Sequence, residues 1–159
     1  DQLLDDGQLD AAMSNFQNLQ DEYSGSPYAS LAALQMARAR MDANQPDLAI
    51  SLYQYVMENG HPKALTVIAR ERLARLMLDQ GQPDEALSLL QGETDISGFE
   101  SRYAEVRGDI HSSQGKNDEA IAAYLEALET LEDGAGDRGT LILKLESMGA
   151  EIPDDGSQS

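Results

Sequence analysis

Apolar and polar residues follow a helical period along most of the chain, and one pattern of them returns at regular intervals. Similar segments start at residues 7, 44, 81 and 115, so they lie 37, 37 and 34 residues apart. They are GQLDAAMSNFQNL, NQPDLAISLYQYV, GQPDEALSLLQGE and GKNDEAIAAYLEA. Four copies at nearly constant spacing indicate an internal repeat.

Each copy keeps the same kinds of residue at the same offsets. Gly or Asn comes first, and Asp follows three residues later, as Asp10, Asp47, Asp84 and Asp118. Two residues further on stands a small side chain, as Ala12, Ala49, Ala86 and Ala120. Four residues beyond it stands a bulky one, as Phe16, Tyr53, Leu90 and Tyr124.

These offsets predict a helical hairpin in each copy. Gly or Asn tolerates the left-handed backbone that ends one helix, and Pro46 and Pro83 suit the first turn of the next. Asp in that turn favours the positive end of the helix dipole. The alanine lets the paired helices approach closely, and the bulky residue on the same face fills the gap between them. Each leading helix also carries a small residue seven positions before the turn, at Ala37, Ala74 and Gly108.

The chain is therefore predicted to be all-α. We expect helices near 9–22, 27–43, 46–59, 62–80, 83–91, 99–114, 117–132 and 137–148. They form one domain over residues 1–150, with repeats at about 1–26 (partial), 27–60, 61–97 and 98–133, and a capping helix at about 137–148. Residues 151–159 are too polar to bury apolar surface, and we expect a mobile tail there.

Charge and composition exclude several classes of binding partner and site. The chain has 29 Asp and Glu against 11 Lys and Arg, a formal net charge of −18, which repels nucleic acid and anionic membrane surfaces. It has no cysteine, so disulfides and thiolate metal sites are excluded. No segment is long and apolar enough to cross a bilayer. Because the chain begins with Asp1 and shows no signal peptide, we expect a processed or trimmed product whose address lay upstream.

Nothing in the sequence indicates catalysis. The two histidines, His61 and His111, lie in different repeats without convergent partners. Nucleophile-elbow, phosphate-loop and calcium-loop spacings are absent. We therefore predict a non-enzymatic protein without cofactor or metal. Met36 and Met77 are expected in the core, and the core is also favoured for Met41 and Met57 over a partly exposed position on a binding surface.

The repeat resembles the tetratricopeptide repeat, a helix-turn-helix unit of about 34 residues. The last copy, RGDIHSSQGKNDEAIAAYLEAL, matches best. The resemblance implies a right-handed superhelical solenoid of helical hairpins. Two departures stand out. Only six residues precede Gly7, so most of the first leading helix is missing, and Gly92-Glu93 interrupts the third copy, so helix 83–91 should be short.

A narrower resemblance covers nearly the whole chain. The runs YASLAALQMARARMDANQPDLAISLY, RERLARLMLDQGQPDEALSLL and YAEVRGDIHSSQGKNDEAIAAYLEALE, with a lone aromatic at Phe99 before the last, are similar to the periplasmic domain of the YfgM family. That family is an ancillary subunit of the SecYEG translocon, with one transmembrane helix near its N-terminus. The resemblance implies a periplasmic domain of a bacterial inner-membrane protein, membrane-tethered only through an upstream helix, which assists secreted polypeptides beside the chaperone PpiD.

The tetratricopeptide resemblance also suggests a binding surface, because leading helices of such arrays line a concave face. The second helices here contain no Lys or Arg, whereas the leading helices carry Arg38, Arg40, Arg70, Arg72, Arg75, Arg102 and Arg107. We therefore predict an acidic convex face and an arginine-bearing groove. The residues expected to face the groove and contact a protein are Leu34, Gln35, Arg38, Met41, Glu71, Arg72, Arg75, Leu78, Arg102, Glu105, Val106 and Asp109. Alternatively, Arg72 and Glu105, or Arg75 and Asp109, pair with each other across adjacent helices.

The sequence thus predicts a protein-interaction module whose partners are proteins: the SecYEG translocon, a PpiD-like chaperone and client polypeptides. Two alternatives remain. One is a soluble tetratricopeptide adaptor in envelope or cytosolic complex assembly, which would allow a cytoplasmic location. The other is a purely structural assembly subunit. The residues upstream of Asp1 discriminate between the tethered and the soluble protein.

Overall fold

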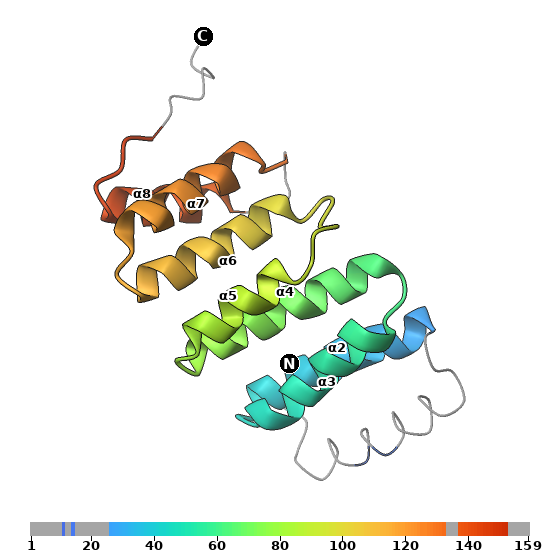
Figure 1. Cartoon of the computed structure of the whole chain (residues 1–159). Coiled ribbons are helices and arrows are strands. Elements are labelled where there is room, and N and C mark those ends of the chain that lie inside the picture. Colours follow the sequence, from blue (N-terminus) through green and yellow to red (C-terminus); the bar gives the residue numbers. More distant parts are fainter. Residues whose placement is uncertain (1–10, 12–13, 15–25, 133–136, 153–159) are drawn as a thin grey trace. The chain divides into compact units, whose positions relative to one another are not determined.

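The computed structural model describes residues 11, 14, 26–132 and 137–152 of the 159-residue chain. Helices α2 to α8 account for most of them, and the described ranges contain no β-strand, so the predicted all-α class is confirmed. The chain divides into two compact units, Asp1–Gln80 and Gly81–Ser159. Figure 1 shows the helices of each unit. The predicted helix 9–22, with Ala12 and Phe16, lies mostly outside the described residues.

Between residues 26 and 80, the first unit contains a hairpin and one further helix. Helix α2 spans Pro27–Asp42, α3 spans Pro46–Asn59 and α4 spans Lys63–Asp79, and α3 packs against both others. Helix α2 begins where the Ser26 hydroxyl accepts the Ala29 N–H at 3.1 Å, which satisfies one open backbone donor. The α2–α3 turn passes through Asn44 with a φ of 57°, the left-handed conformation predicted for this column.

The described part of the second unit contains four helices. Helix α5 spans Pro83–Gln91, α6 spans Glu100–Ser113, α7 spans Asn117–Glu129 and α8 spans Arg138–Ser147. Helix α6 packs against α5 and α7, and α8 packs against α7. Gly81 and Gly115 have φ values of 75° and 71°, so the turn column again adopts the left-handed region. Helix α5 is short, as predicted, because it ends at Gly92.

The helix bounds differ from the predictions mainly at their ends. Helix α7 ends at Glu129 instead of residue 132, and α8 lies one residue inside its predicted span at each end. The predicted mobile tail starts too early. Ile152 is half-buried against the core of the second unit, since an apolar side chain close to a helix end still finds apolar contacts. Met36, Met41, Met57 and Met77 are all half-buried.

The repeat columns form the core. The described alanines of both columns, Ala37, Ala49, Ala74, Ala86 and Ala120, are each 0% exposed. The bulky residues Tyr53, Leu90 and Tyr124 are buried as well. Small residues bring the helix axes close, and the large side chains fill the remaining volume at the density of a protein interior. This pairing confirms the physical reason given for the repeat.

Gly108 shows the constraint most clearly. It is buried in α6, and a Cβ atom placed on it would lie 2.4 Å from Tyr124 Cε1 and 2.5 Å from Cδ1. The Tyr124 ring of α7 therefore rests directly on the α6 backbone. Any side chain at this position would displace the ring or separate the two helices.

We predict that Gly108→Ala destabilises the protein by about 1–3 kcal/mol, because the added methyl group overpacks the α6–α7 contact. Urea unfolding followed by circular dichroism measures the change. In a Tyr124→Leu background the ring is gone, so the same substitution should instead stabilise by about 0.5–1 kcal/mol through helix propensity. A loss of equal size in both backgrounds would contradict the steric explanation.

Candidate functional site

Helix α2 presents an exposed face made of Tyr28, Leu31, Gln35 and Arg38, which we call the α2 face. Tyr28 is 78% exposed and Leu31 is 46% exposed, both large for apolar side chains, and Gln35 and Arg38 are exposed beside them. Spacings of three, four and three residues place all four side chains on one side of the helix. A mixed apolar and cationic face of this kind is suited to contact with a polypeptide.

Three of the predicted contact residues are buried and do not belong to an accessible surface. Leu34 of α2, Glu71 of α4 and Val106 of α6 are at most 5% exposed. Counting back from the turn did not separate these buried positions from the accessible ones on the same helices. Gln35 and Arg38 are exposed, and the other predicted residues, Met41, Arg72, Arg75, Leu78, Arg102, Glu105 and Asp109, are half-buried.

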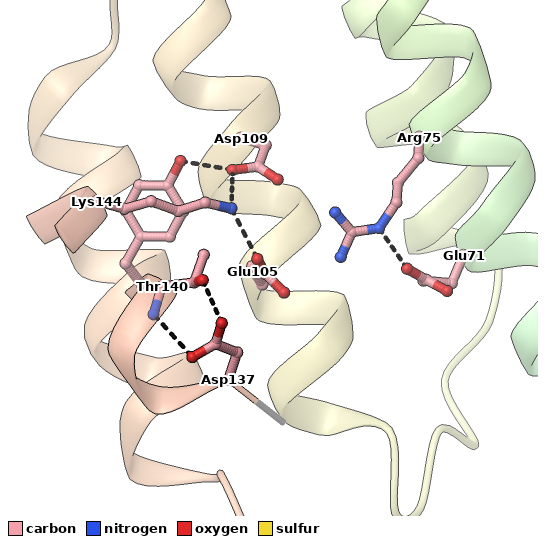
Figure 2. Close-up of polar contacts among 8 residues, drawn as sticks. Glu71, Arg75, Glu105, Asp109, Asp137, Thr140 and Lys144 are labelled. Atoms are coloured by element: carbon pink, nitrogen blue, oxygen red, sulfur yellow. Dashed lines mark hydrogen bonds and ion pairs between the residues drawn. The ribbon is translucent and has the colours of Figure 1, made fainter. Parts of the chain in front are cut away.

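Arg75 binds within its own helix. Its Nε donates to Oε1 of Glu71 at 2.5 Å, between residues four positions apart on α4 (Figure 2). Glu71 is only 1% exposed, and burying a carboxylate without such a partner would cost free energy. Arg75 thus supports the fold of α4, and reversing its charge would disturb the core as well as the surface.

Two further arginines of leading helices form contacts within the helical hairpins. Arg40 is buried, and its Nη1 donates to Oε1 of Gln45 at 2.6 Å, across the α2–α3 turn. Arg107 of α6 pairs with Glu126 of α7 at 2.5 Å. Neither Arg40 nor Arg107 is among the residues predicted to face the groove, and both make their contacts within the hairpins.

The structure brings Glu105 and Asp109 together around a residue that the sequence did not single out, Lys144 of α8. Lys144 Nζ donates to Glu105 Oε1 and to Asp109 Oδ1, each at 2.7 Å (Figure 2). The same Nζ lies 5.3 Å from the centre of the Tyr124 ring, within the range of a cation–π contact. One lysine in the apolar run LILKL is the signal that could have indicated it.

Tyr124 completes this cluster. Its hydroxyl donates to Asp109 Oδ1 at 2.7 Å. Burial, reinforced by this hydrogen bond to a carboxylate, raises the pKa of the Tyr124 phenol well above its ordinary value. The phenol therefore stays protonated and remains a donor, so Asp109 receives both the Lys144 ammonium and a hydroxyl proton.

Asp137 caps the start of α8. Its Oδ1 accepts the Thr140 N–H at 3.1 Å, and its Oδ2 accepts the Thr140 hydroxyl at 2.6 Å (Figure 2). The two hydrogen bonds from Thr140 hold the pKa of the Asp137 carboxyl below its ordinary value of 3.8. This cap satisfies a backbone donor that a helix start leaves open.

The second helices carry carboxylates. Asp47 and Glu58 on α3, and Asp118, Glu119, Glu126 and Glu129 on α7, are exposed. Helices α3, α5 and α7 contain no Lys or Arg, as the sequence indicated. Among the described residues, no group of three His, Cys, Asp or Glu side chains is arranged to hold a metal ion. No described helix combines the length and apolar character that a membrane span requires.

Comparison with protein families gives a match to the tetratricopeptide repeat-like domain over residues 1–150. The chain therefore belongs to the tetratricopeptide repeat-like family. Domains of this class are generally non-catalytic modules for protein–protein interaction. Comparison with curated proteins gave no match.

The Asp137 cap of α8 should depend on pH. Because the folded-state pKa of Asp137 is lowered, its contribution to α8 is present above pH 3.8 and is lost as pH falls through the folded value. The Thr140 amide resonance should therefore titrate with a midpoint below 3.8, measured by NMR. In Asp137→Asn, which caps without titrating, this transition should disappear. A midpoint at or above 3.8 would contradict the assignment.

Proposed function

We propose that this domain binds polypeptide segments through its leading helices, with the α2 face as the principal contact. The observation that carries the proposal is the exposure of Tyr28 and Leu31 next to Arg38 on a single helix face. Two large apolar side chains one helical turn apart form a small exposed patch, and patches rimmed by polar residues mark candidate interaction sites. Tyrosine and arginine are also the residue types that dominate binding energy at protein interfaces.

The charge pattern defines the partner's chemistry. The chain carries a net charge of −18, so its remote field repels acidic proteins. At close range, Arg38 favours a carboxylate or a peptide carbonyl, and the neighbouring Tyr28 and Leu31 favour apolar side chains. A partner that satisfies both conditions is basic or neutral overall and presents an extended, largely apolar segment with exposed carbonyl groups.

Unfolded secreted polypeptides have this chemistry, because their apolar side chains and backbone carbonyls are not yet buried. In line with the resemblance to the YfgM family, we propose that the domain works in the bacterial periplasm, attached to the inner membrane by a helix upstream of this chain. There it would assist the SecYEG translocon together with a PpiD-like chaperone. The resemblance and the α2 face support this role together.

The α2 face is tested by combining Leu31→Ser with Arg38→Glu in the full-length protein. Both side chains are exposed, so the variant should keep its helical circular dichroism spectrum. Loss of a hot-spot contact costs about 1–2 kcal/mol, so copurification of translocon subunits, the chaperone or a client peptide should fall about tenfold. Quantitative mass spectrometry of detergent-solubilised complexes measures it.

The matched control is Asp47→Lys with Glu58→Lys on α3, where both carboxylates are exposed. This variant should retain its partners within about twofold, because the acidic surface of α3 is not the proposed contact. If the α2 variant binds normally and the α3 variant fails, the contact lies on the second helices. If neither changes binding, the α2 face is not a docking surface.

The proposed membrane attachment is tested by the sequence that precedes Asp1 in the encoding gene. An apolar run of about 20 residues there would support the tethered protein, because that length spans the hydrocarbon core of a bilayer. A cleavable signal peptide would instead support a soluble envelope adaptor, and neither feature would favour a cytosolic one.

A further inference from the structure

Helix α8 packs on the second unit through both apolar and charged side chains. It contributes two buried leucines, Leu141 and Leu145, and the ammonium group of Lys144. Beneath them lies a surface of α6 and α7 that we call the α8 seat: Ala104, Glu105, Asp109, Ala120, Tyr124 and Ala127. The apolar members of the seat pack with the leucines, and the polar members hold the lysine.

The polar part of the seat surrounds an ammonium group. The Lys144 Nζ donates hydrogen bonds to the carboxylates of Glu105 and Asp109, at 2.7 Å each, and it lies over the Tyr124 ring. The side chains of Glu105 and Asp109 are 23% and 22% exposed, so solvent screens this charge only partly. The compact ammonium of lysine can donate to both carboxylates at once, which matches this arrangement.

Helix α8 depends on the seat more than the seat depends on α8. It has ten residues, a length at which an isolated helix is marginal in water. Only Leu141 and Leu145 are buried, whereas Leu143 is 66% exposed. The seat, by contrast, is built on α6 and α7, which pack against each other through Gly108 and Tyr124. Local opening should therefore detach α8 before it disturbs the hairpin.

We propose that the α8 seat is a second binding surface, for a helical segment of a partner protein, and that α8 covers it when the partner is absent. The matching segment carries a lysine with apolar residues three positions before it and one position after it, the arrangement of Leu141, Lys144 and Leu145. Because the seat lies in the second unit and the α2 face in the first, this proposal stands independently of the proposed function.

The covalent connection of α8 to α7 determines how strongly a free segment can compete for the seat. A short linker gives α8 a local concentration in the millimolar range, so a free segment competes poorly in the wild-type chain. The apparent dissociation constant equals the intrinsic one divided by the fraction of molecules whose seat is open. A substitution that loosens α8 and leaves the seat intact should therefore increase the affinity for a free segment.

The experiment uses a fluorescein-labelled peptide with the sequence of residues 137–152 and measures its anisotropy with the full chain. Lys144→Ala removes the lysine of α8 but leaves both carboxylates, so it should bind the peptide about tenfold more tightly than wild type. Asp109→Asn is the matched control. It breaks the same ion pair but damages the seat, so its affinity should stay within about threefold of wild type.

Two additional measurements distinguish recognition of the peptide lysine from a general loosening of α8. Asp137→Ala weakens the cap of α8 without touching the seat, so it should also gain peptide affinity, and it serves if Lys144→Ala does not fold. A peptide with alanine in place of its lysine should bind Lys144→Ala about tenfold more weakly than the original peptide. Hydrogen exchange of the α8 amides checks that α8 has opened in each variant.

Equal affinity of Lys144→Ala and Asp109→Asn for the peptide would overturn the proposal, because the carboxylates would then not recognise the lysine. Absence of peptide binding by both Lys144→Ala and Asp137→Ala, with α8 shown to be open, would do the same. If sedimentation shows that the wild-type chain dimerises by exchanging α8, the seat binds a second copy of this chain. That result would overturn the proposal that a different protein supplies the segment.

Discussion

The fold depends on how closely two helices of a hairpin can approach. Glycine or alanine on one helix faces a large side chain on the other, and the pair of Gly108 and Tyr124 is the tightest case, with no room for a single methyl group. The other small residues of the repeat columns are fully buried in the same way. A close-packed interior tolerates neither a gap nor an extra atom at these positions, so they determine the spacing of the helices.

The same contact organises the polar cluster above it. The Tyr124 ring packs against α6 at Gly108, its hydroxyl donates to Asp109, and the Lys144 ammonium lies over the ring. Asp109 and Glu105 then hold Lys144, and with it α8. A steric condition in the core is thereby transmitted through one aromatic side chain to the position of the terminal helix, which is how packing and surface electrostatics are coupled in this unit.

The two units consequently offer different surfaces to partners. The α2 face is exposed and combines apolar groups with a cation. The corresponding region of α6 is acidic, partly buried and already occupied by α8. An array of similar repeats therefore need not present a uniform binding surface. Its leading helices can differ in charge and in availability, because each side chain at the same column position meets different neighbours.

The sequence by itself determined the helices, their turns and the core columns, because these depend on local properties: the left-handed turn at Asn44 and Gly115, the first-turn prolines, and small residues recurring at a helical period. It also indicated the absence of basic residues from the second helices. It did not separate exposed Gln35 from buried Leu34, since a periodic pattern marks the inner side of a helix but not how far the neighbouring helices cover its flanks. It gave no prominence to Lys144 either. The partners of this lysine lie 35 and 39 residues away, and only tertiary packing brings charges that far apart in the chain into contact.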